Sequence, residues 1–266
     1  MRRNVGGEMM TQVRIGGQTI PCSGILFDKD GTLLDFMQMW GSWAEKLIAL
    51  LDNDLTELGA EPIREQSERL GLIIDPTRGI IGYDKTGPIA MGTEEEVTAL
   101  LAWKLYAVGI PWNEATMQVR RHNKRAMQEL TKQKNTVPLP GLPEFLQACH
   151  EAGMKLAVVT SDTTREAEKH LDWMGLRRYF SSVVGRDRVR KGKPDPEMAQ
   201  LAIKEIGLLP QQCIVIGDSN GDMVMGRLAG ASYMIGIAED GTGESYLLDA
   251  DAIIRSYSEL SVLSAQ

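Results

Sequence analysis

The stretch Gly24-Ile-Leu-Phe-Asp-Lys-Asp-Gly-Thr32 places two aspartates, Asp28 and Asp30, directly after a short apolar run. The run is typical of a buried strand over residues 24–28. If strand geometry continues past it, both carboxylates point the same way. Two like charges held close together repel, so the pair favours a cation or a shared proton nearby. Gly31 lets the backbone turn away. The stretch could therefore form a nucleophile, a proton-transfer group, a metal site or a structural turn.

The chain after residue 141 alternates regularly between apolar and amphipathic segments. Residues 135–141 contain two prolines and a glycine and are typical of a linker. Beyond them we predict strands at 155–160, 182–184, 213–217, 232–236 and 252–254, helices at 142–152, 163–174, 196–206 and 221–229, and a terminal helix near 256–263. Repeated strand–helix units with apolar strands predict a doubly wound, mainly parallel (Rossmann-like) α/β sheet covered on both faces.

About 100 residues separate the first strand from the second, and they are mostly helix-like. We interpret residues 36–136 as an inserted helical cap domain, with helices at 93–108 and 113–134 and a Gly/Pro-rich loop at 75–92. Thr93 and Glu96 form a capping signature. Residues 21–35 and 137–266 form the core domain. Residues 1–20 are expected to be a loose tail followed by a small hairpin around Gly16 and Gly17.

Polar side chains follow three of the predicted strands, where ligands of open parallel sheets bind. The groups are Asp28 and Asp30, then Thr160-Ser161-Asp162, then Gly217-Asp218 with Asp222; Lys193 precedes a helix between the last two. Three carboxylates suit Mg²⁺, Thr160 before a helix start suits an anion, and Lys193 could hold a phosphoryl group. A carboxylate such as Asp28 can attack phosphorus, and Asp30 could move the proton.

These motifs, in this order, resemble those of the haloacid dehalogenase superfamily, in the branch with a helical C1-type cap, and most closely the phosphoglycolate phosphatase-like subgroup. The core resemblance covers residues 24 to about 243, whereas the cap matches by position and helical character. It implies Asp28 as nucleophile and Asp30 as acid/base, with Mg²⁺ held by the Asp28 carboxylate, the Asp30 carbonyl and Asp218. Asp222 would support the metal or Lys193, and Thr160, Ser161 and Lys193 would bind the substrate phosphate. The acid at Asp30 resembles phosphatases and phosphomutases rather than dehalogenases.

The composition narrows the class of protein. The 266 residues carry a net charge of −7, which argues against a general nucleic-acid binder. No apolar run approaches the ~20 residues of a membrane span, and Arg2 and Arg3 are not followed by the apolar stretch of a secretory signal. Three scattered cysteines predict reduced, buried thiols in a cytoplasmic protein. The three histidines, His122, His150 and His170, are interpreted as solvated surface residues.

We therefore expect an Mg²⁺-dependent phosphatase that hydrolyses a small phosphorylated metabolite through a phospho-Asp28 intermediate, as a monomer or homodimer, under a cap that excludes water. A phosphomutase of the same fold, a phosphate-binding module without turnover and a phosphatase of a docked protein remain alternatives. Two lysines, Lys191 and Lys193, compete for the phosphate role, and the following proline favours Lys193. Trp40 and Trp43 are interpreted as cap core, and Arg78, Lys85 and Thr86 as solvated loop residues.

Overall fold

The computed structural model describes residues 11–64, 70–75, 77–238 and 244–264. The loose tail expected over residues 1–10 lies outside them. The chain divides into two compact units: residues 1–35 with 136–266, and residues 36–135. The chain thus leaves the first unit directly after the Asp28–Asp30 turn and returns at the linker. Below, the two are called the core unit and the insert unit.

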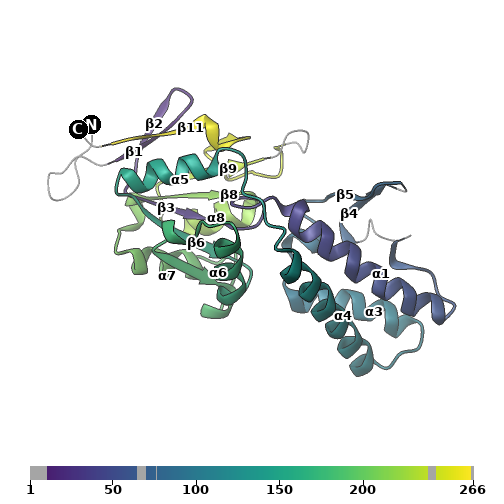
Figure 1. Cartoon of the computed structure of the whole chain (residues 1–266). Helices are drawn as coiled ribbons and strands as arrows, with labels where there is room; N and C mark the ends of the chain where they lie inside the picture. The colour runs from purple at the N-terminus through teal and green to yellow at the C-terminus, as the bar shows by residue number, and fades with distance from the viewer. Residues whose placement is uncertain (1–10, 65–69, 76, 239–243, 265–266) are drawn as a thin grey trace. The chain divides into compact units, whose positions relative to one another are not determined.

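A six-stranded parallel sheet forms the centre of the core unit (Figure 1). Its strand order is β10-β9-β8-β3-β6-β7. The strands are β3 (Gly24–Phe27), β6 (Lys155–Thr160), β7 (Ser182–Gly185), β8 (Cys213–Gly217), β9 (Tyr233–Ile237) and β10 (Ala252–Ile254). The helices are α5 (Leu142–Glu151), α6 (Thr164–Trp173), α7 (Glu197–Ile206) and α8 (Asn220–Ala229). This confirms the predicted doubly wound α/β fold.

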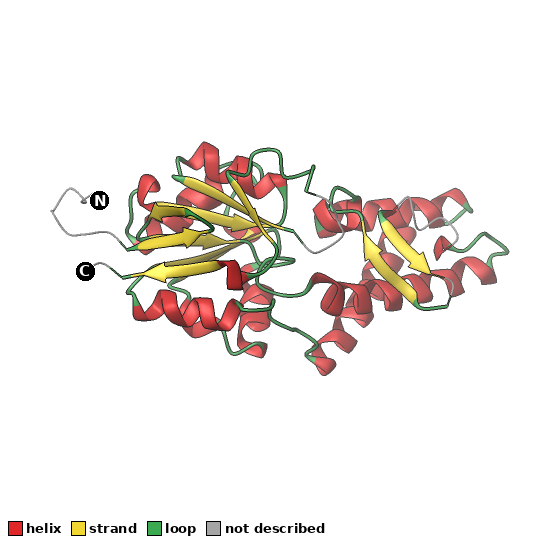
Figure 2. Ribbon diagram, turned by 90° about the horizontal axis from the view of Figure 1, so that it is seen from above, coloured by secondary structure: helices red, strands yellow, loops and turns green. Residues whose placement is uncertain are grey.

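The strands alternate their side chains between two apolar cores, and this is why they are apolar throughout. Ile25 and Phe27 of β3 enter one core together with residues of α5 and α6, whereas Leu26 enters the other with residues of α7 and α8. Figure 2 shows helices on both sides of these strands. A strand buried on both faces has no position for a solvated side chain, so polar residues gather at its ends.

A second, three-stranded antiparallel sheet joins the beginning and the end of the described core unit, in the order β11-β1-β2. Its strands are β1 (Gln12–Ile15), β2 (Gln18–Pro21) and β11 (Leu260–Leu263). The predicted hairpin around Gly16 is therefore present. The terminal helix predicted near 256–263 is wrong: a single 3₁₀ turn (Tyr257–Glu259) leads into β11. Pairing of β11 with β1 supplies the hydrogen bonds, and this partner is distant in the sequence.

The insert unit is largely helical, with α1 (Ser42–Glu57), α3 (Glu94–Ala107) and α4 (Trp112–Gln133) around one apolar core. A π-helical turn (Met37–Gly41) precedes α1. The Thr93–Glu96 capping box is present at the start of α3. The loop predicted at 75–92 is partly wrong, because a hairpin of β4 (Leu72–Asp75) and β5 (Gly79–Tyr83) and a short α2 (Pro88–Met91) occupy this region.

The burial of the side chains of Trp40, Trp43, Lys85 and the three cysteines confirms most of the predictions made for them and contradicts one. Trp40 and Trp43 pack against the core of the insert unit, as predicted. Lys85 was predicted to be solvated and is buried beside the Tyr83 hydroxyl. Cys22, Cys149 and Cys213 are buried free thiols, as predicted. Of the described helices, none is long and apolar enough to cross a membrane.

Candidate active site

The site is built where three adjacent strands of the parallel sheet end. Strand β3 lies between β6 and β8, with Phe27 paired to Val158 on one side and to Ile216 on the other. This register brings the residues that follow each strand to one edge of the sheet: Asp28 and Asp30 after β3, Thr160 and Ser161 at the end of β6, and Asp218 after β8. These groups are neighbours because their strands are adjacent in the sheet, although the strands are far apart in the sequence.

Carboxylate oxygens of Asp28, Asp218 and Asp222 all lie within 4.8 Å of one another. We call these three residues, together with Lys193, the acid cluster. Burial raises the pKa of Asp28 to about 8; Lys193 opposes this, and the carboxylates of Asp222, Asp218 and Asp30 add to it. Three oxygen-donor carboxylates this close are the ligand type of a hard divalent cation, so the residues fit Mg²⁺.

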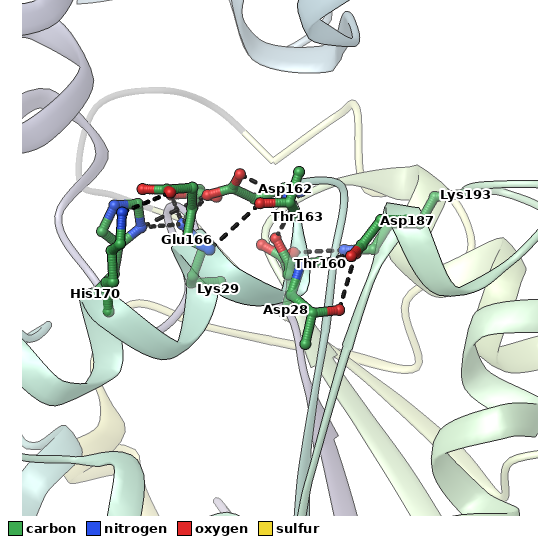
Figure 3. A network of polar contacts seen from close by, with 12 residues as sticks. Asp28, Lys29, Thr160, Asp162, Thr163, Glu166, His170, Asp187 and Lys193 are labelled. Atoms are coloured by element: carbon green, nitrogen blue, oxygen red, sulfur yellow. Dashed lines mark hydrogen bonds and ion pairs between the residues drawn. The ribbon is translucent and has the colours of Figure 1, made fainter. Parts of the chain in front are cut away.

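Lys193 is the cation of the acid cluster. Its ammonium donates to Asp28 Oδ1 (Figure 3). It also lies 2.6 Å from Asp222 Oδ1. Burial alone lowers the pKa of Lys193, but the carboxylates of Asp222 and Asp28 outweigh it and leave the pKa well above its ordinary value. Lys191, by contrast, is largely exposed and pairs with Asp195 at 3.5 Å. Of the two lysines, Lys193 is therefore the one that contacts the site.

Asp222 is held by its own helix start. Its Oδ2 accepts hydrogen bonds from the Ser219 backbone nitrogen at 3.1 Å and from Ser219 Oγ at 2.6 Å, forming a capping box at the start of α8. One oxygen thus caps α8 while the other faces Lys193. Asp222 consequently acts on the cluster mainly by holding Lys193 next to Asp28.

Two glycines leave room for these carboxylates. Gly31 has a φ of +75°, and a Cβ there would lie 2.1 Å from Asp218 Oδ2. A Cβ on Gly217 would lie 2.5 Å from the Cβ of Asp222. A side chain at either position would push an aspartate out of the cluster, so both positions need glycine for close approach, and Gly31 needs it for the turn as well.

The other predicted residues lie at the same edge in different roles. Thr160 is fully buried, and its Oγ1 accepts from the Asp162 backbone nitrogen at 3.1 Å, which fixes the turn after β6. Ser161 is exposed at that turn. Strand geometry ends at Phe27, so the period of two does not extend to Asp30. The Asp30 carboxylate instead meets its neighbour Lys29, with 2.6 Å between Nζ and Oδ1.

Sequence reasoning missed a second cluster around Lys29. This side chain is fully buried and lies with Asp30, Asp162 and His170, which we call the Lys29 cluster. His170 was predicted to be solvated, and so was His122; both predictions are wrong, because both rings are buried. His150 is exposed as predicted. No sufficient signal for this burial was present in the sequence, because a lysine between two aspartates at a strand end can equally be solvated.

Residues 22–230 match the haloacid dehalogenase-like hydrolase family. The chain belongs to this family. The family predicted from the motifs is thereby confirmed.

Relatives among curated proteins include phosphatases. A phosphorylated carbohydrates phosphatase of Thermotoga maritima is 27% identical over 229 residues, which is 86% of this chain and 91% of that protein. A phosphoglycolate phosphatase of Salmonella typhimurium is 29% identical over 89% of this chain and 90% of that protein. They support the prediction that this haloacid dehalogenase-like hydrolase is a phosphatase. The fold is shared with CbbY of Rhodobacter sphaeroides, with a TM-score of 0.62 and 20% identity over 90% of this chain and 96% of that one.

Proposed function

We propose that the protein hydrolyses a small phosphate monoester by transferring the phosphoryl group to Asp28 and then to water. The observation that carries this proposal is the acid cluster, in which the Asp28 carboxylate is held between Lys193 and two further aspartates. Such an environment holds a nucleophilic oxygen still and leaves negative charge for a divalent cation to balance. The similarity to phosphatases that act on phosphorylated carbohydrates and phosphoglycolate supports a small phosphorylated metabolite as substrate.

The first step forms a bond between an Asp28 oxygen and phosphorus while the bond from phosphorus to the leaving oxygen breaks. Asp30 donates a proton to that oxygen, so a neutral alcohol departs. Lys193 donates hydrogen bonds to the transferring phosphoryl oxygens and to Asp28. In the second step Asp30 takes a proton from water as the water oxygen bonds to phosphorus. The bond between phosphorus and Asp28 then breaks and releases phosphate.

The cation would be held by the Asp28 and Asp218 carboxylates and the Asp30 carbonyl, with Asp222 in support through Lys193. When bound there, Mg²⁺ supplies positive charge that offsets the repulsion between the carboxylates and the phosphate. We expect chelation with EDTA to abolish phosphate release and excess Mg²⁺ to restore it. Ca²⁺ should restore only a small part, because its looser coordination misplaces the nucleophile. Full activity in the chelated protein would contradict the metal site.

The function is tested by screening the purified protein against a panel of phosphorylated metabolites, with release of inorganic phosphate as the readout. We expect steady release from one or a few monoesters in the presence of Mg²⁺. Isomerisation of a sugar phosphate that is stimulated by a bisphosphate, without net phosphate release, would instead identify a phosphomutase. Binding of inorganic phosphate without turnover of any ester would identify a binding module.

A further inference from the structure

Of the Lys29 cluster, only Asp30 takes part in the chemistry above, and Lys29, Asp162 and His170 have no role in it. Lys29 lies between the nucleophile and the acid/base in the sequence and is fully buried. Moving an ammonium out of water costs several kcal/mol unless good partners compensate. An apolar residue at this position would avoid that cost. The burial of a positive charge here therefore indicates that the charge has a function.

The partners of the ammonium come from three separate segments. Lys29 Nζ lies 2.6 Å from Asp30 Oδ1, 3.1 Å from His170 Nδ1 and 3.4 Å from Asp162 Oδ2. Figure 3 shows Lys29, Asp162 and His170 pointing toward one another at this point. An ammonium has three N–H donors. Asp30 and His170 lie within hydrogen-bond distance of it, and Asp162 adds an ion pair, so contacts from three segments limit where the ammonium can lie.

The protonation states agree with this geometry. Burial lowers the pKa of Lys29, but Asp30 and Asp162 outweigh it and raise the pKa above its ordinary value. Burial, with Lys29 adding to it, lowers the pKa of His170 to about 3. The ring is therefore neutral, and because the lysine can only donate, His170 Nδ1 accepts and Nε2 carries the proton. His170 serves as a fixed acceptor on α6.

Asp30 differs from Lys29 and His170 in its access to solvent. Its side chain is 21% exposed, whereas those of Lys29 and His170 are fully buried. Asp30 Oδ1 is thus held by Lys29, while part of the side chain is in contact with solvent. General acid–base catalysis requires a carboxylate that is held in a defined orientation.

We propose that Lys29 is a positioning residue: supported by His170 and Asp162, it holds the Asp30 carboxylate in the orientation from which Asp30 exchanges a proton with the leaving oxygen. This inference rests on the proposed function, since it assigns Lys29 to the acid/base of that reaction. It separates the two lysines of the site, because Lys193 acts on the phosphoryl group and the nucleophile, and Lys29 acts on the proton.

The test compares two substrates that differ in their need for an acid. In 4-nitrophenyl phosphate the leaving oxygen departs without a proton, whereas in an alkyl monoester (2-phosphoglycolate, or the best substrate of the panel) it needs one. The ratio kcat/KM reports the steps up to transfer of the phosphoryl group to Asp28. In K29M, which keeps most of the length of the side chain but not its charge, we expect kcat/KM to fall about 100-fold for the alkyl ester and less than about 5-fold for 4-nitrophenyl phosphate.

The control is K204M, which removes an exposed lysine on α7 of the same unit and should leave both values unchanged. If K29M does not fold, K29Q replaces it, because the glutamine amide keeps one donor for Asp30 without a charge. An equal loss on both substrates, no loss on either, or failure of both variants to fold would overturn the proposal and leave Lys29 a structural residue. Absence of turnover in the wild-type protein would overturn the proposed phosphatase function instead.

Discussion

The acid cluster and the Lys29 cluster are each built around one buried lysine, yet their charges are balanced differently. In the acid cluster there are three carboxylates and one ammonium; burial raises the pKa of Asp28 to about 8, and the neighbouring carboxylates add to this. In the Lys29 cluster two carboxylates and a neutral imidazole lie within 3.4 Å of the ammonium. The first arrangement therefore has one more carboxylate for each ammonium than the second, and it is the one that favours a further cation. The larger excess of carboxylates marks the place for metal and phosphate, and the smaller excess marks a support.

The largest effect that separates the clusters is expected at the nucleophile. Asp28→Asn should lower phosphate release by at least about 10⁴-fold, because the amide cannot form the covalent intermediate. Its unfolding temperature should not fall, since the change removes one of three crowded carboxylates. Activity assays and thermal unfolding of the same preparation check both statements. Retained activity would remove the covalent mechanism.

A smaller effect is expected at the lysine of the acid cluster. Lys193→Met should lower kcat/KM by about 100- to 1000-fold on both ester types, because a charged donor to the phosphoryl group serves every leaving group. Lys191→Met is the matched control two residues away; its exposed side chain pairs only weakly with Asp195 in solvent, and it should change kcat/KM less than about 2-fold. The comparison with K29M, whose loss depends on the leaving group, separates the roles of the two lysines. If the loss in Lys193→Met also depended on the leaving group, the two lysines would not have separate roles.

The smallest effect concerns stability and belongs to the Lys29 cluster. The pKa of His170 is lowered from 6.5 to about 3, so between these values the unfolded chain binds a proton that the folded protein does not. Stability is therefore fully present above pH 6.5 and falls as the pH drops towards 3. In His170→Gln, whose amide oxygen can still accept from Lys29, this part of the loss should be absent.

Denaturant unfolding at pH 7 and pH 5 measures the difference. The wild-type protein should lose about 2 kcal/mol more than His170→Gln between these two values. His150→Gln, a change at an exposed ring, is the control and should lose as much as the wild type. Equal losses in all three proteins would show that His170 is not buried as a neutral ring.

The fold of the core unit could be predicted well from the sequence, because the residue types within each segment there match the structure that the segment adopts. Strands buried on both faces are apolar throughout, and their polar ends could be read directly at Asp28, Thr160 and Asp218. The prediction failed where a distant partner decides the structure. Residues 260–263 form a strand because β1 is there to pair with them, and the loop predicted at 75–92 contains a hairpin whose strands complete each other.

The site likewise has one part that local sequence patterns predict and one part that depends on partners distant in the sequence. The sequence by itself determined the family, the parallel sheet and the residues of the acid cluster, because each of them follows a recognisable strand end at a defined spacing. Only the tertiary structure decided that Lys29, Asp162 and His170 meet, because α6 and the turn after β6 converge on β3 from positions more than 100 residues along the chain. A charge can be recognised in a sequence. Whether it is solvated, and which atoms balance it, depends on burial, and burial is a property of the folded chain.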